Sequence, residues 1–363
     1  MKEKIEQHLQ NKTVSRKLKE QEKVRAQNDS KVNVACFDLQ QVLTTPHTMS
    51  SQLYYRRKLA TYNLTVFDVG KKDGRSYMWH EGVAKRGANQ IASCVWKYII
   101  DKVENEHCSE FVFFTDNCGG QNKNKTIAGM YMHAVKDLPI QRISHYYLET
   151  GHTQNEGDSM HAVIERASKH ANIYTPMQWC TLASTAKKSG LSYQVLEMEG
   201  QMKDFKYLGE IYCKQLQEAV SLKSPEWNKV KCLMADKESP HVLFIKYVHY
   251  ETSFVPFVSA SGHEASASPV ALENESTVSK AKKDDLLYMC NQLIIPRDYH
   301  SFYKSLALER KSISDASETQ QHEQEASTAN KKKDRSSLAA KTLRNRSAVT
   351  GYRRTATKTK KRL

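Results

Sequence analysis

The chain has 363 residues, of which 39% are hydrophobic and 26% charged, and its formal net charge is +15. Its length excludes a disulfide-stapled mini-protein and leaves room for a sizeable core, while the lean hydrophobic content indicates that part of the chain does not pack. No apolar run reaches the ~18 residues of a membrane-spanning helix. The eight cysteines show no CxxC spacing, so we expect a soluble protein with reduced thiols and no membrane contact.

The positive charge is concentrated near the C-terminal end. Residues 331–363 hold 13 Lys and Arg against one acid, Asp334, so this segment carries +12 of the net +15. Such a density predicts contact with DNA and a nuclear location, the alternative being a solvated tail without a partner. No small-molecule cofactor is expected, and a homo-oligomer is compatible with the sequence.

The first half of the chain alternates between strand and helix patterns. Residues 1–30 predict a polar helix. Strands are predicted at 32–40, 54–69 and 75–81, with a turn at 70–74, followed by a helix at 85–106, a strand at 110–115, a helix at 122–138, a strand at 142–150 and a helix at 156–171. This β-β-β-α-β-α-β-α order predicts an α/β domain over residues 31–172, built on a mixed five-stranded sheet with helices on its faces.

The pattern weakens after residue 172. We expect a small C-terminal α+β extension over 173–256, with a helix opened by Pro176, a strand at 191–199 and a hairpin formed by 228–235 and 241–248. The composition further predicts a disordered insertion over 257–283, a helical return segment over 284–310 and a disordered basic tail over 311–363.

Three carboxylates occupy comparable positions in the predicted domain. Asp38 lies in the first strand, Asp116 ends the fourth strand and Asp158 begins the last helix, with Glu156 beside it. In a sheet of this order the first and fourth strands are neighbours and the last helix crosses nearby, so these acids can converge. Converging carboxylates repel one another and are costly to bury unless a cation lies among them. Oxygen ligands suit Mg²⁺ or Mn²⁺, and two such ions ~4 Å apart support phosphoryl transfer.

The element order resembles the ribonuclease H-like fold shared by ribonuclease H, retroviral integrases and DDE transposases, in which acids on the first strand, the fourth strand and the last helix bind two metal ions. The resemblance covers residues 31–172. More narrowly, FDLQQVLTTP, FTDNCGGQNKN and GHTQNEGDSMHAVIE resemble a family of transposon-derived animal proteins that carry such stretches in this order. The resemblance implies that Asp38 and Asp116 are the first two catalytic, metal-binding acids.

The third acid stays open between two residues. The stretch GHTQNEGDSMHA resembles a ribonuclease H stretch with N-E-x-x-D but is one residue shorter, so either Asp158 or Glu156 faces the metal, and we favour Asp158. The resemblance also offers Glu81, just before the first core helix, as a metal ligand; the alternative is a charge partner for the helix N-terminus. His152 is a candidate proton shuttle or phosphate-steering residue, the alternative being a bond to a backbone carbonyl.

The segment after Asp116 contains more amides and lysines than a strand-to-helix turn requires. Either Asn122 or Asn124 can cap the following helix, and Gly119 and Gly120 permit the turn. The remaining polar side chains favour contact with phosphates or metal-bound water. The predicted nucleic-acid contacts are Asn117, Gln121, Asn122, Lys123, Asn124 and Lys125.

These observations favour a transposon-derived nuclease or DNA strand transferase that uses two divalent metals, with DNA held partly by the basic tail. The alternative is a domesticated, catalytically inactive nuclear module that binds DNA or protein. A third class, an RNA-directed nuclease, is permitted by the ribonuclease H-like stretch, but no RNA-specific motif supports it.

Overall fold

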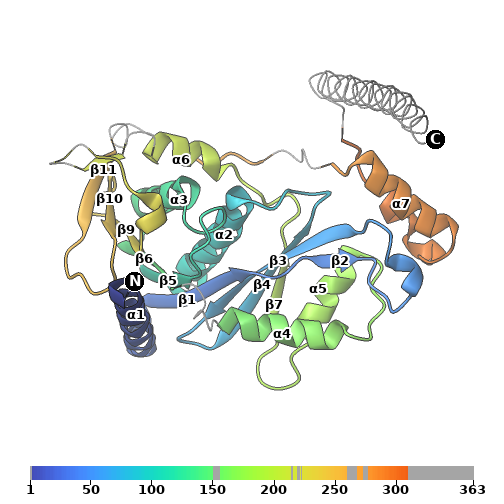
Figure 1. Ribbon diagram of the computed structural model, residues 1–363, viewed down its shortest axis with the longest axis horizontal. Helices are drawn as coiled ribbons and strands as arrows, with labels where there is room; N and C mark the ends of the chain where they lie inside the picture. The colour runs from blue at the N-terminus through green and yellow to red at the C-terminus, as the bar shows by residue number, and fades with distance from the viewer. Residues whose placement is uncertain are drawn as a thin grey trace, which may run out of the picture. The chain divides into compact units, whose positions relative to one another are not determined.

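The strands predicted around the three acids form the centre of one mixed sheet. The computed structural model (Figure 1) describes residues 2–149, 156–213, 216–218, 221, 223–259, 268–272 and 277–309. The central strands follow the order β4-β3-β1-β5-β6. The β1–β3 and β3–β4 pairs are antiparallel, whereas β1–β5 and β5–β6 are parallel. These strands are β1 (Val32–Leu39), β3 (Leu59–Asp68), β4 (Asp73–His80), β5 (Glu110–Thr115) and β6 (Arg142–Tyr147).

The sheet is larger than the five strands expected, because later segments pair with both of its edges. Within the described residues it has 11 strands: β7 pairs with β4 at one edge, β9, β10, β11 and β8 continue beyond β6, and β2 pairs with β3. Pairing of this kind covers the backbone groups that an edge strand would otherwise leave open. The added strands are β2 (Leu43–Thr45), β7 (Gln194–Glu197), β8 (Leu216–Glu218), β9 (Cys232–Asp236), β10 (Val242–Lys246) and β11 (Val255–Ser259).

The strand predicted over 54–69 begins later than expected. A short 3-10 helix, η1 (Ser51–Leu53), precedes it, and regular pairing begins at Leu59. Tyr54 and Tyr55, whose aromatic rings favoured a strand, are 79% and 89% exposed and lie outside the sheet. Aromatic residues favour strands mainly because they pack there, so exposed tyrosines carry no such preference.

Helices cover both faces of the sheet, and the alternation of side chains along β1 separates the two faces. Ala35, Phe37 and Leu39 pack in the core shared with α2, α3 and α6. Val34 and Cys36 belong to the opposite face, where α1 and α4 contact β1. In Figure 1 α2 and α3 lie on one side of the sheet and α4 and α5 on the other. The helices are α1 (Lys2–Asn28), α2 (Ala88–Glu106), α3 (Lys125–Asp137), α4 (Glu156–Ser168), α5 (Pro176–Thr185) and α6 (Phe205–Cys213).

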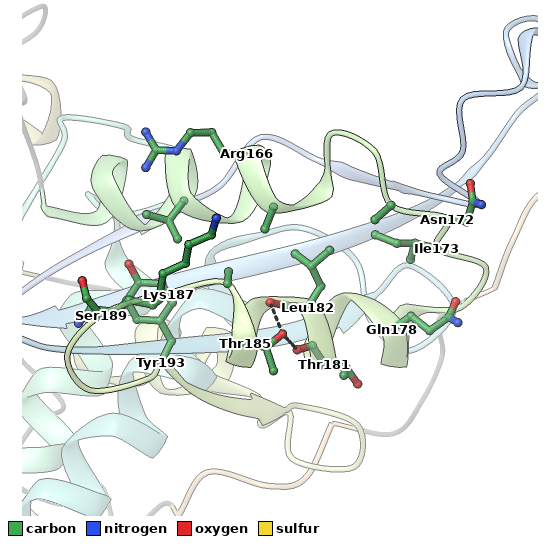
Figure 2. Close-up of a pocket in the computed structure, with 15 residues that line it drawn as sticks. Arg166, Asn172, Ile173, Gln178, Thr181, Leu182, Thr185, Lys187, Ser189 and Tyr193 are labelled. Atoms are coloured by element: carbon green, nitrogen blue, oxygen red, sulfur yellow. Dashed lines mark hydrogen bonds between the residues drawn. The ribbon is translucent and has the colours of Figure 1, made fainter.

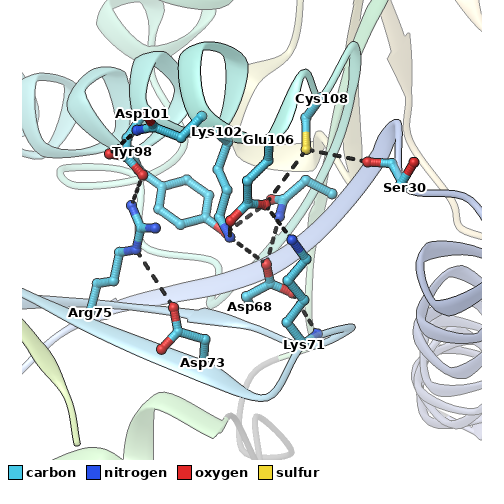
Figure 3. Close-up of polar contacts among 12 residues, drawn as sticks. Ser30, Asp68, Lys71, Asp73, Arg75, Tyr98, Asp101, Lys102, Glu106 and Cys108 are labelled. Carbon is cyan, nitrogen blue, oxygen red and sulfur yellow. Dashed lines mark hydrogen bonds and ion pairs between the residues drawn. The ribbon is translucent and has the colours of Figure 1, made fainter. Parts of the chain in front are cut away.

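A buried ion pair joins α2 to the end of β3 (Figure 3). The Lys102 side chain is 0% exposed, and its Nζ lies 2.8 Å from both Asp68 Oδ2 and Glu106 Oε1. Asn33 donates a further hydrogen bond to the Asp68 carboxylate. Burial of a charge is tolerated where it is paired and hydrogen-bonded, so this network fixes α2 against the β3–β4 hairpin.

Residues 277–309 return to the start of β3. Leu286 and Met289 of α7 and Tyr303 of α8 pack with Leu53 and Leu59. These last elements are α7 (Lys280–Asn291), η3 (Arg297–Tyr299) and α8 (His300–Ser305), and a short helix η2 (Trp227–Lys229) precedes β9. Residues Met1–Leu308 form one compact unit.

Two predicted regions are described only in part or not at all. The insertion predicted over 257–283 contains the end of β11 and the start of α7, and the stretches 260–267 and 273–276 lie outside the described residues. The basic tail predicted over 311–363 lies wholly outside them. Among the helices that are described, none has the length and apolarity needed to cross a membrane.

Candidate metal centre

Asp38 and Asp116 lie side by side at the ends of two parallel strands. The register pairs Cys36 of β1 with Phe114 of β5. Two residues further along the chain come Asp38, near the end of β1, and Asp116, just after the end of β5, and the charge of Asp116 acts on the Asp38 carboxyl. Adjacent strands are about 4.8 Å apart. Asp38 also shares the strand parity of Cys36, which directs its side chain to the face covered by α4. The sheet therefore brings together the two acids on which the sequence hypothesis rests.

Asp158 and His161 of α4 complete a compact group with Asp38. One ligand atom from each of these three residues lies within 4.8 Å of the others. Asp158 and His161 are three residues apart, which places them on one face of the helix. Asp158 is exposed, Asp38 is half-buried and His161 is buried, so the group is open on one side. We call Asp38, Asp158 and His161 the acid–histidine group.

Thr65 of β3 orients the histidine. Its hydroxyl donates to the Asp38 backbone oxygen at 3.2 Å and lies 2.9 Å from His161 Nε2. Because the single hydroxyl proton is used toward Asp38, Nε2 of the neutral ring must donate to Thr65, which leaves the Nδ1 lone pair free. Gln40 reinforces the arrangement by donating to the His161 carbonyl oxygen at 3.4 Å.

The electrostatics of the site are those of crowded carboxylates. Burial, the charge of Asp116 and, to a smaller extent, the charge of Asp158 together raise the pKa of Asp38 to about 7. The Leu39 N–H, 2.8 Å from Asp38 Oδ1, and Arg86 oppose this shift. Burial lowers the pKa of His161 to about 4 despite the neighbouring Asp158, so the ring is neutral at pH 7. A divalent cation would relieve the repulsion between the acids and accept the neutral imidazole as a ligand.

Glu156 does not face this group. Its Oε2 forms an ion pair with Lys19 of α1 and accepts a hydrogen bond from the Cys36 thiol at 3.2 Å. Burial acts to raise the pKa of Glu156, but Lys19 outweighs it and the pKa is lowered. Of the two candidates for the third acid, Asp158 is thus the one that lies with Asp38.

Glu81, a further predicted metal ligand, lies away from the acid–histidine group. The Glu81 carboxylate accepts the Ala60 N–H at 2.7 Å and pairs with Lys282 of α7 at 2.6 Å. Glu81 is thus held at Ala60 of β3, whereas Asp38 pairs with Thr65 of the same strand. Glu81 therefore lies about five residues along β3 from the acid–histidine group. His152 falls outside the described residues.

The amides that follow Asp116 have mainly structural partners. Asn122 Nδ2 donates to Asp116 Oδ1 at 2.6 Å, and the Cys118 N–H approaches the same oxygen at 3.3 Å. Asn124 is the N-cap of α3, because its Oδ1 accepts the Ile127 N–H at 3.1 Å. Asn122 therefore holds a candidate ligand and Asn124 begins a helix, and neither side chain is simply displayed to solvent.

Lys123 has a role that the sequence did not indicate. Its ammonium is buried and donates to the backbone oxygens of Asn228 at 2.9 Å and Val230 at 3.4 Å. Burial and the nearby Lys231 lower its pKa to about 8. Lys123 thus ties this loop to the segment leading into β9, and its ammonium is not placed to meet a phosphate.

The other three predicted nucleic-acid contacts differ in their exposure to solvent. Lys125 is exposed at the start of α3, and Gln121 is half-buried. The Asn117 Oδ1 atom is buried and has no hydrogen-bond partner within the part of the chain that the structure describes. A buried, unpaired amide oxygen next to Asp116 is a feature that a ligand or a metal-bound water can satisfy.

A sequence profile described as Domain of unknown function (DUF7869) matches residues 51–239. The chain belongs to this family. The DUF7869 region contains Asp116, Asp158 and His161, whereas Asp38 and the rest of β1 precede it. No curated protein and no solved structure matches the chain.

His161 was missed as a ligand in the sequence. The signal was present in the DUF7869 region as Asp158-x-x-His161, a spacing that puts both side chains on one side of a helix. Two ligand types three residues apart do not by themselves indicate a metal site, because the remaining ligands come from distant parts of the chain. The structure supplies the missing partner from β1, a strand more than a hundred residues earlier.

Proposed function

We propose that this DUF7869 protein has a ribonuclease H-like core and carries out metal-dependent phosphodiester chemistry on DNA, as a relative of transposon-derived nucleases and strand transferases. The fold part of the proposal rests on the strand order β4-β3-β1-β5-β6, with only β3 antiparallel to β1. The chemical part rests on one observation, the convergence of Asp38, Asp158 and His161 within 4.8 Å, with Asp116 on the neighbouring strand.

In this proposal the four side chains would hold Mg²⁺ or Mn²⁺. The donor set is mainly carboxylate oxygen, which suits these hard cations, and the imidazole nitrogen shifts the preference toward Mn²⁺. When bound, such ions lower the pKa of a coordinated water and stabilise charge on the phosphodiester oxygens. Asp38 lies between Asp116 and Asp158, so its carboxylate is the one that can serve two ions.

Three neighbouring residues, Thr65, Asn122 and Asn117, support the four proposed metal ligands. Thr65 keeps His161 in the tautomer that can bind a cation, and Asn122 holds one oxygen of Asp116, leaving the other oxygen free. The Asn117 amide oxygen, buried beside Asp116, can accept a hydrogen bond from a water or a 3′-hydroxyl and so orient it. These contacts restrict the motion of the acids, and restriction of this kind is what a positioned metal site requires.

An inactive binding module is the second candidate, and two observations favour it. Glu156 is engaged by Lys19, and one of the four remaining positions is a histidine where carboxylates are expected. A histidine supplies no negative charge to balance a second divalent cation. In this alternative the acids persist, and the protein binds DNA or a protein partner without cleaving it.

The test is a cleavage assay on the full chain with supercoiled plasmid, a DNA duplex and an RNA–DNA hybrid, each with Mg²⁺, Mn²⁺ or EDTA. We expect metal-dependent nicking of DNA that falls to background in Asp158→Asn and persists in Asp298→Asn, an exposed carboxylate on η3. Faster cleavage of the RNA–DNA hybrid than of DNA would show that the substrate is RNA paired with DNA. Absence of cleavage together with intact Mn²⁺ binding would favour the inactive module.

A further inference from the structure

A groove with a volume of about 1020 Å³ runs between α4 and α5 (Figure 2). Its wall includes the apolar side chains of Ile173 and Leu182, and one end is closed by the loop that follows α5. This groove lies on another side of α4 from the acid–histidine group, because Val163 and Ala167 of α4 line it while Asp158 and His161 do not. None of the residues that line the groove has a role in the metal site described above.

The charge in the groove is of one sign. Three cationic side chains line it, those of Arg166, Lys187 and Lys188, and no Asp or Glu is among its lining residues. Within the described ranges none of the three forms an ion pair with a carboxylate. Uncompensated like charges around one depression repel each other and attract an anion, which is the electrostatic signature of a phosphate-binding surface.

The hydrogen-bond donors gather at one end of the groove. The Thr181 and Thr185 hydroxyls donate to helix carbonyls, Thr181 to Met177 O at 3.2 Å and Thr185 to Thr181 O at 2.9 Å, so their protons are committed to α5. Figure 2 shows Arg166 of α4 and Lys187 of the following loop in the part of the groove where Ser189 and Tyr193 also lie. A ligand anion would therefore lie at this end.

The loop that carries the lysines is ordered by local contacts. The Lys187 ammonium lies 5.4 Å from the centre of the Tyr193 ring, a cation–π distance. Tyr193 is buried, and Gly190 has a φ of 75°, a left-handed conformation that lets the loop turn back. The contact between Lys187 and Tyr193 thus anchors the loop, and Lys187 lies across the groove from Arg166.

The groove and the acid–histidine group are within reach of one nucleic-acid strand. Arg166 follows Asp158 by eight residues, so the two lie about 12 Å apart along the α4 axis. One strand of DNA advances about 3.4 Å per nucleotide, so this separation corresponds to about three to four nucleotides.

We propose that the groove between α4 and α5 binds the phosphate backbone of a DNA strand, through Arg166, Lys187 and Lys188, three to four nucleotides from the phosphate held at the acid–histidine group. This assignment rests on the proposed function for its substrate and goes beyond it by placing the strand across the outer side of α4. The apolar wall accommodates the sugar edges, and the three cations contact phosphates without reading sequence.

The experiment compares two double variants of the full chain that remove the same charge. Arg166→Ala with Lys187→Ala alters the groove, and Lys97→Ala with Lys206→Ala alters α2 and α6 on the opposite face. Binding of a fluorescent 20-base-pair duplex is measured by anisotropy across a salt series, and amide exchange is followed by mass spectrometry with and without the duplex. Calcium replaces Mg²⁺ so that no cleavage occurs.

We expect the groove variant to lose at least about tenfold in affinity and its salt slope to fall by about 1.8, the value for two lost phosphate contacts. Residues 163–172 and 186–193 should be protected from exchange by the duplex in the parent and not in the groove variant. Equal losses in both variants, no loss, or protection of these segments by a poly-glutamate peptide but not by DNA would overturn the proposal.

Mn²⁺ titration of the same proteins separates this proposal from the function on which it rests. If the groove variant binds Mn²⁺ as the parent does and loses only DNA affinity, the groove assignment and the proposed metal-dependent function are both supported. If the parent binds DNA through the groove but no Mn²⁺, the metal chemistry fails while the groove assignment stands.

Discussion

The Thr65 hydroxyl lies 2.9 Å from Nε2 of His161, and this contact leaves Nδ1 as the ring nitrogen with a free lone pair. Thr65→Val keeps the shape of the side chain but removes the contact, so the imidazole loses its fixed orientation. We expect the Mn²⁺ affinity to fall by about 10–100-fold, the usual cost of losing a partner that orients a metal ligand. Isothermal titration calorimetry measures this directly.

Thr61→Val is the matched control for Thr65→Val. Thr61 lies on the same strand and bonds Thr45 Oγ1 at 2.9 Å, away from the acids. Both variants should lose about 1 kcal/mol of stability with one buried hydrogen bond. If Thr61→Val weakens Mn²⁺ binding as much as Thr65→Val, the orienting role of Thr65 is wrong.

Crowding of the acids predicts an unusual pH dependence of stability in the metal-free protein. The pKa of Asp38 is about 7 in the folded chain, against 3.8 for an aspartate in an unfolded chain. Because the folded pKa is the higher one, the folded state holds the extra proton between these values, and the free energy of unfolding falls as the pH rises from about 4 to 7. Asp38 is expected to lower the free energy of unfolding by roughly 2–4 kcal/mol over this pH range.

Urea unfolding in EDTA at pH 5 and pH 8 measures that loss. Asp38→Asn should remove this part of the pH dependence and make the metal-free protein more stable than the parent at pH 8, and Asp298→Asn should leave both unchanged. Added Mn²⁺ should stabilise the parent and not Asp38→Asn. A parent whose stability does not fall between pH 5 and 8 would contradict the account of Asp38.

The buried Lys102 should be essential for stability. Lys102→Met leaves the Asp68 carboxylate buried without its cation, which typically costs about 3–5 kcal/mol. Combining it with Asp68→Asn should restore much of the loss, because the uncompensated charge is removed. Lys71→Met is the control: Lys71 also pairs with Glu106, at 2.8 Å, but its side chain is 58% exposed, so about 1 kcal/mol or less is expected. Denaturant midpoints measure the stability of each variant. Equal losses of stability in Lys102→Met and Lys71→Met would contradict the essential role of Lys102.

The contact of α3 with α6 should not tolerate a methyl group. A Cβ added at Gly129 would lie 2.7 Å from Gly209 Cα and 2.9 Å from Leu208 O, which are backbone atoms that cannot turn aside. We expect Gly129→Ala to cost about 1–3 kcal/mol although alanine favours helices. At Gly120 nothing lies within 4 Å of the added Cβ, so Gly120→Ala should be nearly neutral. A more stable Gly129→Ala would show that the helices are further apart.

Local patterns carried most of what the sequence predicted correctly. The strand over Glu110–Thr115 and the helix opened by Pro176 follow from side-chain periodicity and helix-start signals. The proximity of Asp38 and Asp116 followed from element order alone. These features depend on neighbours in the chain or on a few connection rules.

Long-range pairings account for what the sequence did not reveal. The buried position of Lys123 depends on the backbone of Asn228 and Val230, a hundred residues later. The pairing of Glu156 with Lys19 depends on where α1 lies, which a polar helix pattern does not specify. The groove requires Arg166 and Lys187 to face each other from two elements, and no local periodicity encodes that arrangement.

The most direct test of the central claim is Mn²⁺ binding by the full chain, followed by calorimetry and by the electron paramagnetic resonance signal of the bound ion, in the parent, Asp158→Asn and Glu156→Gln. The two variants change neighbouring acids of α4, of which only Asp158 lies with Asp38 and His161. The account predicts binding by the parent and by Glu156→Gln and loss of binding in Asp158→Asn. A parent that binds no Mn²⁺, or an Asp158→Asn variant that binds it as tightly as the parent, would contradict it.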